Sequence, residues 1–301
     1  MSAGVEGTAA GAAAPETNAV VPEAVAVIGG GRMGAGIAQS FAAIGSRVTV
    51  VESGAEAAAA ALDRVATGLA RAAERGKLAE PAETVLARVA TAASPEELPA
   101  GIELVVEAVP EDAALKAKLL AAAEQAVSDD TVLATNTSSL SVTELGAALR
   151  RPARFLGMHF FNPVPASALI ELVVAPETAD ATLQSALAWT HALGKTDVVV
   201  KDSPGFASSR LGLALGLEAV RMVEEGVAEP AAIDAAMSLG YKHPMGPLRL
   251  TDLVGLDVRL AIAEYLQATL GERFAPPALL REKVARGKLG RKTGQGFCTW
   301  D

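Results

Sequence analysis

The sequence predicts an α/β protein, in which a Rossmann-type, doubly wound sheet is followed by an all-helical C-terminal domain. Three observations predict it. A glycine-rich turn lies between two strand-like apolar runs near the N-terminus, and short apolar runs then alternate with helical segments to about residue 202. Beyond that point the strand pattern stops and helical periodicity continues. Such alternation is typical of a mostly parallel sheet with helices on both faces.

The first strand–turn–helix–strand unit spans residues 25–52 and reads VAVIGGGRMGAGIAQSFAAIGSRVTVVE. Gly29, Gly31 and Gly34 have the G-x-G-x-x-G spacing of a dinucleotide-binding turn, which allows a tight turn, close approach of a pyrophosphate and close helix packing. Glu52 ends the second strand, where a carboxylate binds the adenosine ribose hydroxyls and repels a 2′-phosphate. We therefore expect NAD rather than NADP. The expected cofactor contacts in the turn also include Gly30, Arg32 and Met33.

The remaining elements follow the same logic. An Ala-rich helix is expected from residue 53 to about 77, then a helical or looped excursion to residue 100. A helix is expected at 112–126, and strands at IELVVEAV, TVLATN, RFLGMHF, LIELVVAP and TDVVVKD. From residue 203 onward, segments such as LGLALGLEAVRMVEEGV carry helical periodicity, and KDSPG at 201–205 punctuates the change. We expect a disordered tail at 1–22, an NAD-binding domain at 23–202 and a helical domain at 203–301.

Composition excludes several classes of function. The 301 residues suffice for two domains, and half of them are hydrophobic. A net charge of −9 and a pI near 5.0 argue against nucleic acid or an anionic membrane as a partner. No apolar run has membrane-spanning length, and the first twenty residues do not resemble a secretory signal. Cys298 is the only cysteine, and no histidine has zinc-ligand spacing, so we expect no metal and a reducing cytoplasm.

Polar residues at strand ends are the candidates for chemistry, because ligands of open α/β sheets collect outside the carboxyl ends of the strands. Three places qualify: NTSS at 136–139, HFFNP at 159–163, and Glu171 within an apolar run. A buried carboxylate needs a partner. A pair with His159 satisfies both groups and makes a base, since the carboxylate fixes the tautomer and stabilises the imidazolium. The alternatives are a core histidine bonded to backbone and a glutamate at a water-facing strand edge.

The serines near residue 140 have two roles that are compatible. At least one serine in TSSLSVTEL is expected to cap a helix that starts near Val142, and Ser138 or Ser139 can do so. A serine beside the nicotinamide can also bind a substrate hydroxyl. Covalent catalysis is not expected, because no G-x-S-x-G elbow is present. His191, late in a helix, and His243, in a loop, lack a comparable setting.

Seven motifs together resemble the short-chain L-3-hydroxyacyl-CoA dehydrogenases, which include 3-hydroxybutyryl-CoA dehydrogenases. They are IGGGRMGAGIAQ, NTSSL, GMHFFNPVP, IELV, KDSPGF, HPMGPLRLTDLVGLDV and GRKTGQGF, and they occur in the family's order from about residue 23 to 301. The resemblance implies that a Rossmann-type domain binds NAD, that a helical domain forms a homodimer, and that an acyl-CoA lies in the cleft between them.

The resemblance also assigns roles by position. It makes His159 the catalytic histidine, Glu171 its partner carboxylate, and Ser138 a contact of substrate and cofactor. The remaining matches are cofactor contacts: Glu111 and Lys116 near the nicotinamide ribose and phosphates, Asn162 near the nicotinamide, and Lys292 near the C-terminus.

One position departs from the family pattern. The family usually reads PGF-x-x-Asn-Arg after the domain junction, where the asparagine approaches the reacting end of the substrate; here Ser209 takes its place. A serine reaches less far than an amide, so an altered substrate range or thioester orientation is expected. Basic residues for the CoA phosphates are not clearly preserved. The nearest candidates are Arg71, Arg75 and Lys77, which are explained equally well as solvated helix charges.

The activity implied is the NAD-dependent interconversion of (S)-3-hydroxyacyl-CoA, such as 3-hydroxybutyryl-CoA, and 3-oxoacyl-CoA, with His159 as the base. Two alternatives stay open. One is a dehydrogenase of a non-CoA hydroxy acid or of an acyl group on a carrier protein, and the other is a non-catalytic NAD-binding protein. The expected partners are the acyl-CoA and a second copy of the chain, because the apolar helix faces exceed what one small bundle needs.

Overall fold

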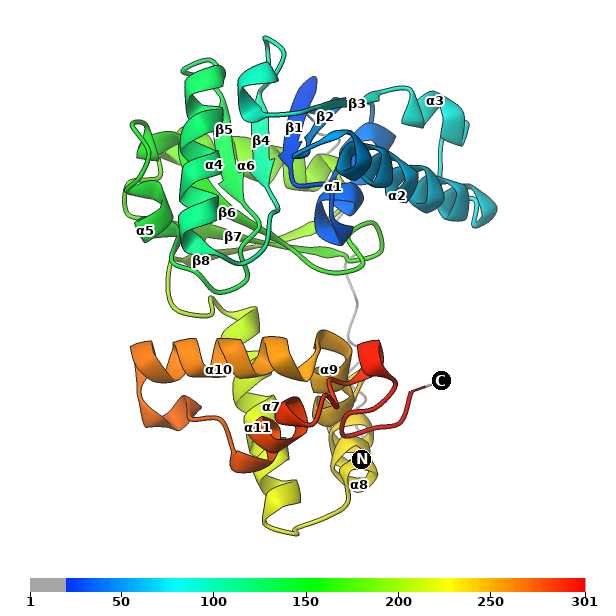
Figure 1. Ribbon diagram of the computed structural model, residues 1–301, viewed down its shortest axis with the longest axis vertical. Helices are drawn as coiled ribbons and strands as arrows, with labels where there is room; N and C mark the ends of the chain where they lie inside the picture. Colours follow the sequence, from blue (N-terminus) through cyan, green and yellow to red (C-terminus); the bar gives the residue numbers. More distant parts are fainter. Residues whose placement is uncertain (1–19, 301) are drawn as a thin grey trace, which may run out of the picture.

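The computed structural model describes residues 20–300, which form an α/β domain and a helical domain (Figure 1). Most of the tail expected at 1–22 therefore lies outside the described residues. Within its last three residues, Val20 is exposed, whereas Pro22 is buried and its carbonyl oxygen accepts a hydrogen bond from Ser46 Oγ at 2.6 Å.

The α/β domain contains one eight-stranded sheet in the order β3-β2-β1-β4-β5-β6-β7-β8. Neighbouring strands are parallel except β6 and β7, which are antiparallel. The predicted Rossmann-type, mostly parallel sheet is confirmed. The strands are β1 Ala24–Ile28, β2 Arg47–Val51, β3 Val89–Ala92, β4 Leu104–Glu107, β5 Val132–Thr135, β6 Phe155–Phe160, β7 Leu169–Val174 and β8 Thr196–Lys201.

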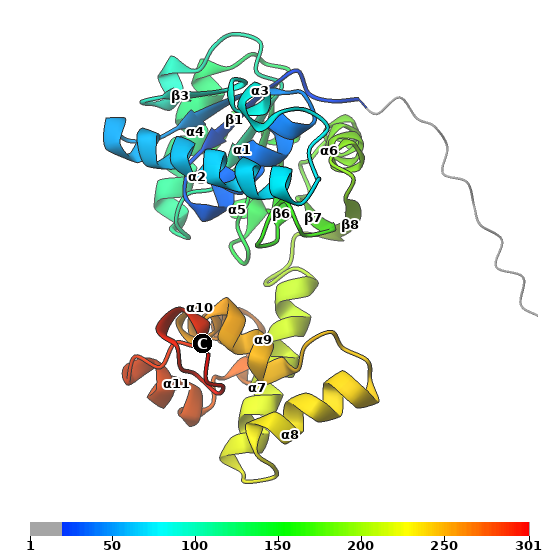
Figure 2. The ribbon, with the colours of Figure 1, turned by 90° about the vertical axis from the view of Figure 1, so that its right-hand side faces the viewer.

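Both faces of the sheet are covered, so alternate residues of one strand enter two different cores. In β1, Val25 and Val27 pack with α1, α2 and α6, whereas Ala26 and Ile28 pack with α4 and α5. This two-sided burial explains why the strands are continuous apolar runs. Figure 2 shows α1, α2 and α6 on the near side of the sheet. These helices are α1 Arg32–Ala43, α2 Ala55–Glu74, α3 Ala82–Leu86, α4 Ala113–Ala126, α5 Val142–Gly146 and α6 Asp180–Ala192.

One element of the sheet is missing from the expectation. The excursion expected at 77–100 contains β3, which pairs in parallel with β2 from Val89 to Ala92 and forms the edge of the sheet. The strand has only four residues, and the side chains of Ala90 and Thr91 are exposed. An edge strand that buries little has no clear apolar run, so periodicity does not reveal it.

The helical domain follows β8 and lies beyond the lower end of the sheet in both views (Figures 1 and 2). Its core uses the spacing seen in the sequence, since Leu213, Leu217 and Val220 of α7 all point into it. A buried carboxylate, Asp252, accepts hydrogen bonds from the backbone N–H groups of Phe297 and Cys298 and so fixes the C-terminal segment. The helices are α7 Ser208–Glu224, α8 Pro230–Ala235, α9 Pro247–Val254, α10 Leu256–Leu270 and α11 Ala278–Ala285; a π-helical turn, Ala236–Gly240, extends α8.

Within residues 20–300, no helix is long and apolar enough to cross a membrane. The same residues contain no group of three or more His, Cys, Asp or Glu side chains placed to hold a metal ion.

Candidate active site

A cleft of about 600 Å³ lies between the two domains. Its sheet side is formed by the last two residues of β6, by residues that follow β4, β5 and β6, and by the start of α1, and its other side is formed by α7, α9 and α10. A smaller hollow of about 320 Å³ lies beside the first residues of β1 and β2 and contains none of the candidate residues. The candidates that line the large cleft are Arg32, Met33, Glu111, Ser138, His159, Asn162 and Ser209.

The glycine turn at the start of α1 has the geometry of a phosphate-binding turn. Gly29 has φ +94°, which few other residues adopt, and a Cβ on Gly34 would lie 1.7 Å from the Gly29 carbonyl oxygen. A Cβ on Gly31, by contrast, would meet no atom of residues 20–300 within 4 Å. The first turn of α1 has neither a side-chain cap nor an acidic residue, so its N–H groups are available to an anion.

Glu52 lies next to this turn, at the end of β2. Its Oε1 accepts a hydrogen bond from the Gly30 N–H at 2.6 Å, which holds the carboxylate against the glycine turn. The open space at Gly31, the uncapped N-terminus of α1 and the carboxylate at Glu52 together fit a dinucleotide whose adenosine ribose has a free 2′-hydroxyl.

The antiparallel pairing of β6 with β7 brings His159 and Glu171 together. The two residues are direct partners in the strand register, so their side chains lie on the same face of the sheet. His159 Nδ1 is 3.0 Å from Glu171 Oε2. His159 is 7% exposed and lines the cleft, whereas Glu171 is 1% exposed and lies behind it. Glu171 is thus not at a water-facing strand edge.

Glu171 also connects the sheet to the helical domain. Its Oε1 accepts hydrogen bonds from the backbone N–H groups of Ala207 and Ser208, and its Oε2 accepts one from Ser208 Oγ at 2.6 Å. Burial by itself raises the pKa of this carboxyl group, but the hydrogen bonds from His159, Ser208 and Ala207 outweigh burial and hold the pKa below its ordinary value. The carboxylate is therefore ionised at neutral pH.

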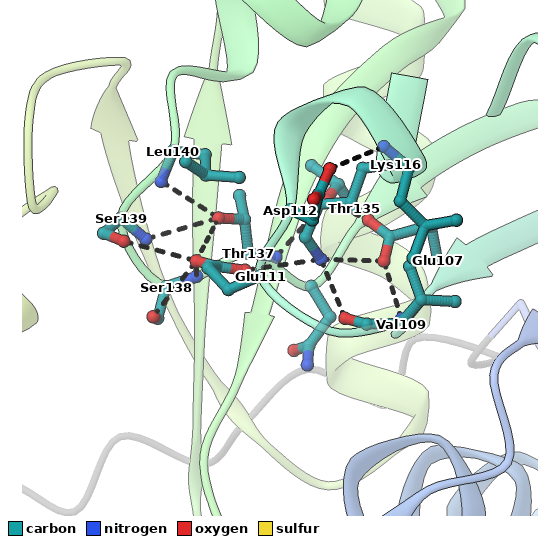
Figure 3. Close-up of polar contacts among 12 residues, drawn as sticks. Glu107, Val109, Glu111, Asp112, Lys116, Thr135, Thr137, Ser138, Ser139 and Leu140 are labelled. Atoms are coloured by element: carbon teal, nitrogen blue, oxygen red, sulfur yellow. Dashed lines mark hydrogen bonds and ion pairs between the residues drawn. The ribbon is translucent and has the colours of Figure 1, made fainter. Parts of the chain in front are cut away.

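A second carboxylate network lies beneath the cleft at the ends of β4 and β5 (Figure 3). Lys116 Nζ is 2.7 Å from Glu107 Oε1 and 3.4 Å from Glu111 Oε2, and Thr135 Oγ1 donates to Glu107 Oε2 at 2.6 Å. Glu107 and Lys116 are both fully buried. Lys116 was expected to contact the cofactor, yet it does not line the cleft; its ammonium group lies under the loop that does.

Glu111 holds the serine loop in place. It accepts hydrogen bonds from Thr137 Oγ1 at 2.6 Å and from the Ser138 N–H at 2.9 Å, while the hydroxyls of Ser138 and Ser139 lie 3.3 Å away (Figure 3). Burial raises the pKa of Glu111, but the charge of Lys116 and these hydrogen bonds outweigh it and lower the pKa below its ordinary value.

Helix capping falls to a neighbouring serine. Ser141 Oγ accepts the Glu144 N–H at the start of α5. The serine that caps this helix is therefore Ser141, not Ser138 or Ser139. Ser138 lines the cleft instead. Asn136, which also lines the cleft, accepts the Phe160 N–H through Oδ1 at 2.8 Å and so connects the ends of β5 and β6.

Four further candidates lie elsewhere. Lys292 forms an ion pair with Asp257 in the helical domain and does not line the cleft. Arg71, Arg75 and Lys77, the candidates for CoA phosphates, are exposed residues on and just after α2.

Three residues of the site were missed in the sequence. Glu107 ends an apolar strand just as Glu171 interrupts one. The rule that a buried carboxylate needs a partner could therefore have found Glu107 as well. Ser208 has no distinguishing pattern, because it stands in a run of small residues before Ser209. Arg259, which lines the cleft from α10, looks like an ordinary helix charge in the sequence.

The family model described as "3-hydroxyacyl-CoA dehydrogenase, NAD binding domain" matches residues 24–203, and "3-hydroxyacyl-CoA dehydrogenase, C-terminal domain" matches residues 205–300. A probable 3-hydroxybutyryl-CoA dehydrogenase of Bacillus subtilis is 42% identical over 92% of this chain and 97% of its own. The mitochondrial hydroxyacyl-coenzyme A dehydrogenase of Homo sapiens is 38% identical over 92% and 91% of the two chains.

Solved structures match over nearly the whole chain. The crystal structure of (S)-3-hydroxybutyryl-CoA dehydrogenase from Ralstonia eutropha has a TM-score of 0.88 and 40% identity, and covers 93% of this chain and 99% of that one. A second similar structure, FadB2 of M. tuberculosis, has a TM-score of 0.89 and 39% identity over 94% of this chain and 100% of that one.

Proposed function

The chain belongs to the 3-hydroxyacyl-CoA dehydrogenase family, and from this premise we propose that it uses NAD and the His159–Glu171 pair to interconvert short-chain (S)-3-hydroxyacyl-CoA and 3-oxoacyl-CoA. The family membership makes it an NAD-dependent oxidoreductase. The observation that carries the assignment of the base is the 3.0 Å contact between His159 Nδ1 and Glu171 Oε2 at the wall of the interdomain cleft.

The residues at the start of α1 and the end of β2 would hold the cofactor. The N–H groups of the uncapped α1 turn suit its pyrophosphate, and Glu52 suits the adenosine ribose hydroxyls. When bound, NAD supplies the acceptor for the hydride that leaves C3 of the substrate.

His159 acts as the general base in the direction of oxidation. Its Nδ1–H donates to Glu171, which leaves the lone pair of Nε2 free to accept the substrate hydroxyl proton. The ionised Glu171 stabilises the imidazolium that forms, and three donors from Ala207 and Ser208 keep that carboxylate charged and in position. In the reverse direction, His159 returns the proton to the oxygen at C3.

Ser138 and Ser209 position the substrate oxygens. Both line the cleft, from the sheet side and from α7 respectively. Ser138 is held by Glu111, so its hydroxyl is fixed on the loop that follows β5. Glu107 and Lys116 act one step further away, because they keep the Glu111 loop in place from below.

The test follows NADH absorbance with purified protein and acetoacetyl-CoA, with NADPH in parallel. We expect oxidation of NADH, a much slower reaction with NADPH, and a fall in kcat on the order of 10²–10⁴ for His159→Gln, because a general base contributes about that much. His159→Gln is expected to bind NADH as tightly as the unaltered protein.

His191→Gln is the matched control. His191 also pairs with a carboxylate, Asp197, but it is 59% exposed in its side chain and lies outside the cleft. Full activity of His159→Gln would refute the assignment of the base. An unaltered protein that binds NADH but reduces no 3-oxoacyl-CoA, while it acts on free hydroxy acids or on carrier-bound acyl groups, would refute the CoA thioester as substrate.

We further propose that the enzyme acts as a cytoplasmic homodimer. Large apolar side chains are exposed on the helical domain, with Leu211 69%, Leu239 80% and Tyr241 74% exposed, and a second copy of the chain would cover them.

A further inference from the structure

Arg259 is a buried cation in the wall of the cleft. It lies in the first turns of α10, is 6% exposed and lines the cleft. Across residues 20–300, no carboxylate forms an ion pair with it, and its buried Nε atom has no hydrogen-bond partner. Burial alone lowers the pKa of Arg259 to about 10, with no neighbouring acid opposing it, and the group stays charged at neutral pH.

The guanidinium lies against the first turns of α7. A methyl group on Gly212 would lie 3.6 Å from Nη1 and 3.7 Å from Nη2 of Arg259. Gly212 is one helical turn beyond Ser208, so the guanidinium is roughly 6 Å along α7 from the residue that binds Glu171. The cation is therefore close to the reacting end of the substrate. It is far in the sequence from Arg71, Arg75 and Lys77, the exposed basic residues on and just after α2.

The surroundings of Arg259 suit an acyl chain that ends in an anion. The neighbouring lining residues from α9 and α10 are apolar, which fits methylene groups: Leu250, Leu253, Val254, Val258 and Ile262. On α7, Ser209 and Gly212 are both small and leave this wall free of bulk. A buried charge without a partner costs folding free energy, and a ligand of opposite charge recovers it. Among anions, a carboxylate matches the planar guanidinium through two parallel hydrogen bonds.

We propose that Arg259 binds a second carboxylate at the far end of the acyl chain, so that the preferred substrates are short 3-hydroxy-dicarboxylyl thioesters. This inference rests on the proposed function and names the substrate class of the same cleft. Arg259 is then the residue that determines specificity, while His159 and Glu171 perform the proton transfer on any 3-hydroxyacyl thioester that the cleft admits.

The experiment compares two substrates of equal carbon number, (S)-3-hydroxyadipyl-CoA and (S)-3-hydroxyhexanoyl-CoA, with NAD. We expect the unaltered enzyme to have a kcat/KM at least tenfold higher for the adipyl substrate. Arg259→Met should lower that value by at least 30-fold, mainly through KM, and change the value for the hexanoyl substrate less than threefold. Arg259→Lys keeps the charge but not the bidentate geometry, and should retain part of the preference.

Arg273→Met is the control, because it removes an exposed arginine of the same domain that does not line the cleft. Thermal unfolding gives a second readout: Arg259→Met should have a Tm equal to or above that of the unaltered protein, since it removes an unpartnered buried charge. If Arg259→Met fails to fold, the substrate preferences of the unaltered enzyme and of Arg259→Lys decide whether Arg259 binds the second carboxylate.

Three outcomes are distinguishable. Equal kcat/KM for the two substrates in the unaltered enzyme would overturn the inference, as would an equal loss for both in Arg259→Met, which indicates contact with the thioester or the cofactor. Turnover of neither substrate by the unaltered enzyme would instead overturn the proposed function on which the inference rests.

Discussion

Glu171 has two tasks at once, because it contacts both His159 and the start of α7. Oε2 meets His159, on which the proposed chemistry depends, and also accepts the Ser208 hydroxyl, while Oε1 accepts the backbone N–H groups at the N-terminus of α7. A carboxylate at a helix N-terminus is favoured by the free N–H groups and the helix dipole. The acid is therefore part of both the site and the joint between the two domains.

Replacing Glu171 by Gln tests both tasks. The amide keeps the shape but loses the charge, and its NH₂ group cannot accept the Nδ1–H of His159 or the Ser208 hydroxyl proton. We expect kcat to fall on the order of 10²–10⁴, the range of general acid–base catalysis. We also expect a loss of about 1–3 kcal/mol in the free energy of unfolding at pH 7, because buried donors lose their acceptor.

The stability loss should depend on pH. The pKa of Glu171 is lower in the folded protein than its ordinary value of 4.5, so its stabilising contribution is present above that value and is lost as the pH falls through the folded pKa. Urea unfolding at pH 7 and below pH 4.5 checks this: the difference between the unaltered protein and Glu171→Gln should shrink in acid. A difference that stays constant would show that the charge of Glu171 does not stabilise the joint.

At the scale of elements, the glycine turn and the start of α1 contain glycines with two different roles. Gly34 is required for packing, whereas Gly31 leaves room for a ligand. Gly34 must be glycine because α1 crosses the backbone of Gly29 too closely for a Cβ. Gly31 has φ −62°, which any residue adopts, and open space where a Cβ would point. Only the approach of a bound molecule gives a reason for glycine there.

The two substitutions Gly31→Ala and Gly34→Ala form a matched pair. We expect Gly34→Ala to unfold at lower temperature, with a loss of about 1–3 kcal/mol or more from overpacking. Gly31→Ala should keep its Tm and bind NADH at least tenfold more weakly, which is about 1.4 kcal/mol. Calorimetric titration with NADH and thermal unfolding measure the two effects. If Gly31→Ala bound NADH as tightly as the unaltered protein, the placement of the pyrophosphate at this turn would be contradicted.

The pair β6–β7 is the element on which the proposed base depends. The sequence indicates two strands with a polar residue in each, but it does not indicate that they run antiparallel with His159 opposite Glu171. A shift in register by one residue would turn one of the two side chains to the other face. Residue chemistry predicts a contact between His159 and Glu171, and the strand register supplies its structural cause.

At the scale of the whole molecule, the cleft exists only because two domains meet. Neither the sheet nor the helical domain encloses it alone, and Ser208 with Glu171 fastens the two together at its base. The helical domain also presents the exposed apolar side chains that we assign to a dimer.

The dimer predicts a mass twice the 30.5 kDa of the chain in light scattering coupled to gel filtration. The double variant Leu239→Glu, Tyr241→Glu should run as a monomer, because two charges would be buried at the interface. Val20→Glu, which places a charge at an exposed position just before the first domain, is the control and should leave the mass unchanged. A monomeric unaltered protein would contradict the proposal.

The sequence by itself determined the fold class, the cofactor turn and the chemistry expected of His159 and Glu171. These depend on local signals: strand and helix periodicity, glycines at fixed spacing, and a carboxylate that an apolar strand cannot bury alone. Motif order also led to the family, which the comparisons confirmed.

Only the tertiary structure decided which groups meet across the domains. It brought Ser208 to Glu171, placed Lys116 beneath the cleft rather than in it, and left the buried Nε of Arg259 without a hydrogen-bond partner among residues 20–300. Strand β3 likewise becomes recognisable only from its pairing with β2. The physical reason is the same in each case: burial and pairing are properties of residues far apart in the chain, and a helical pattern does not say which charged residue on it will face a cleft.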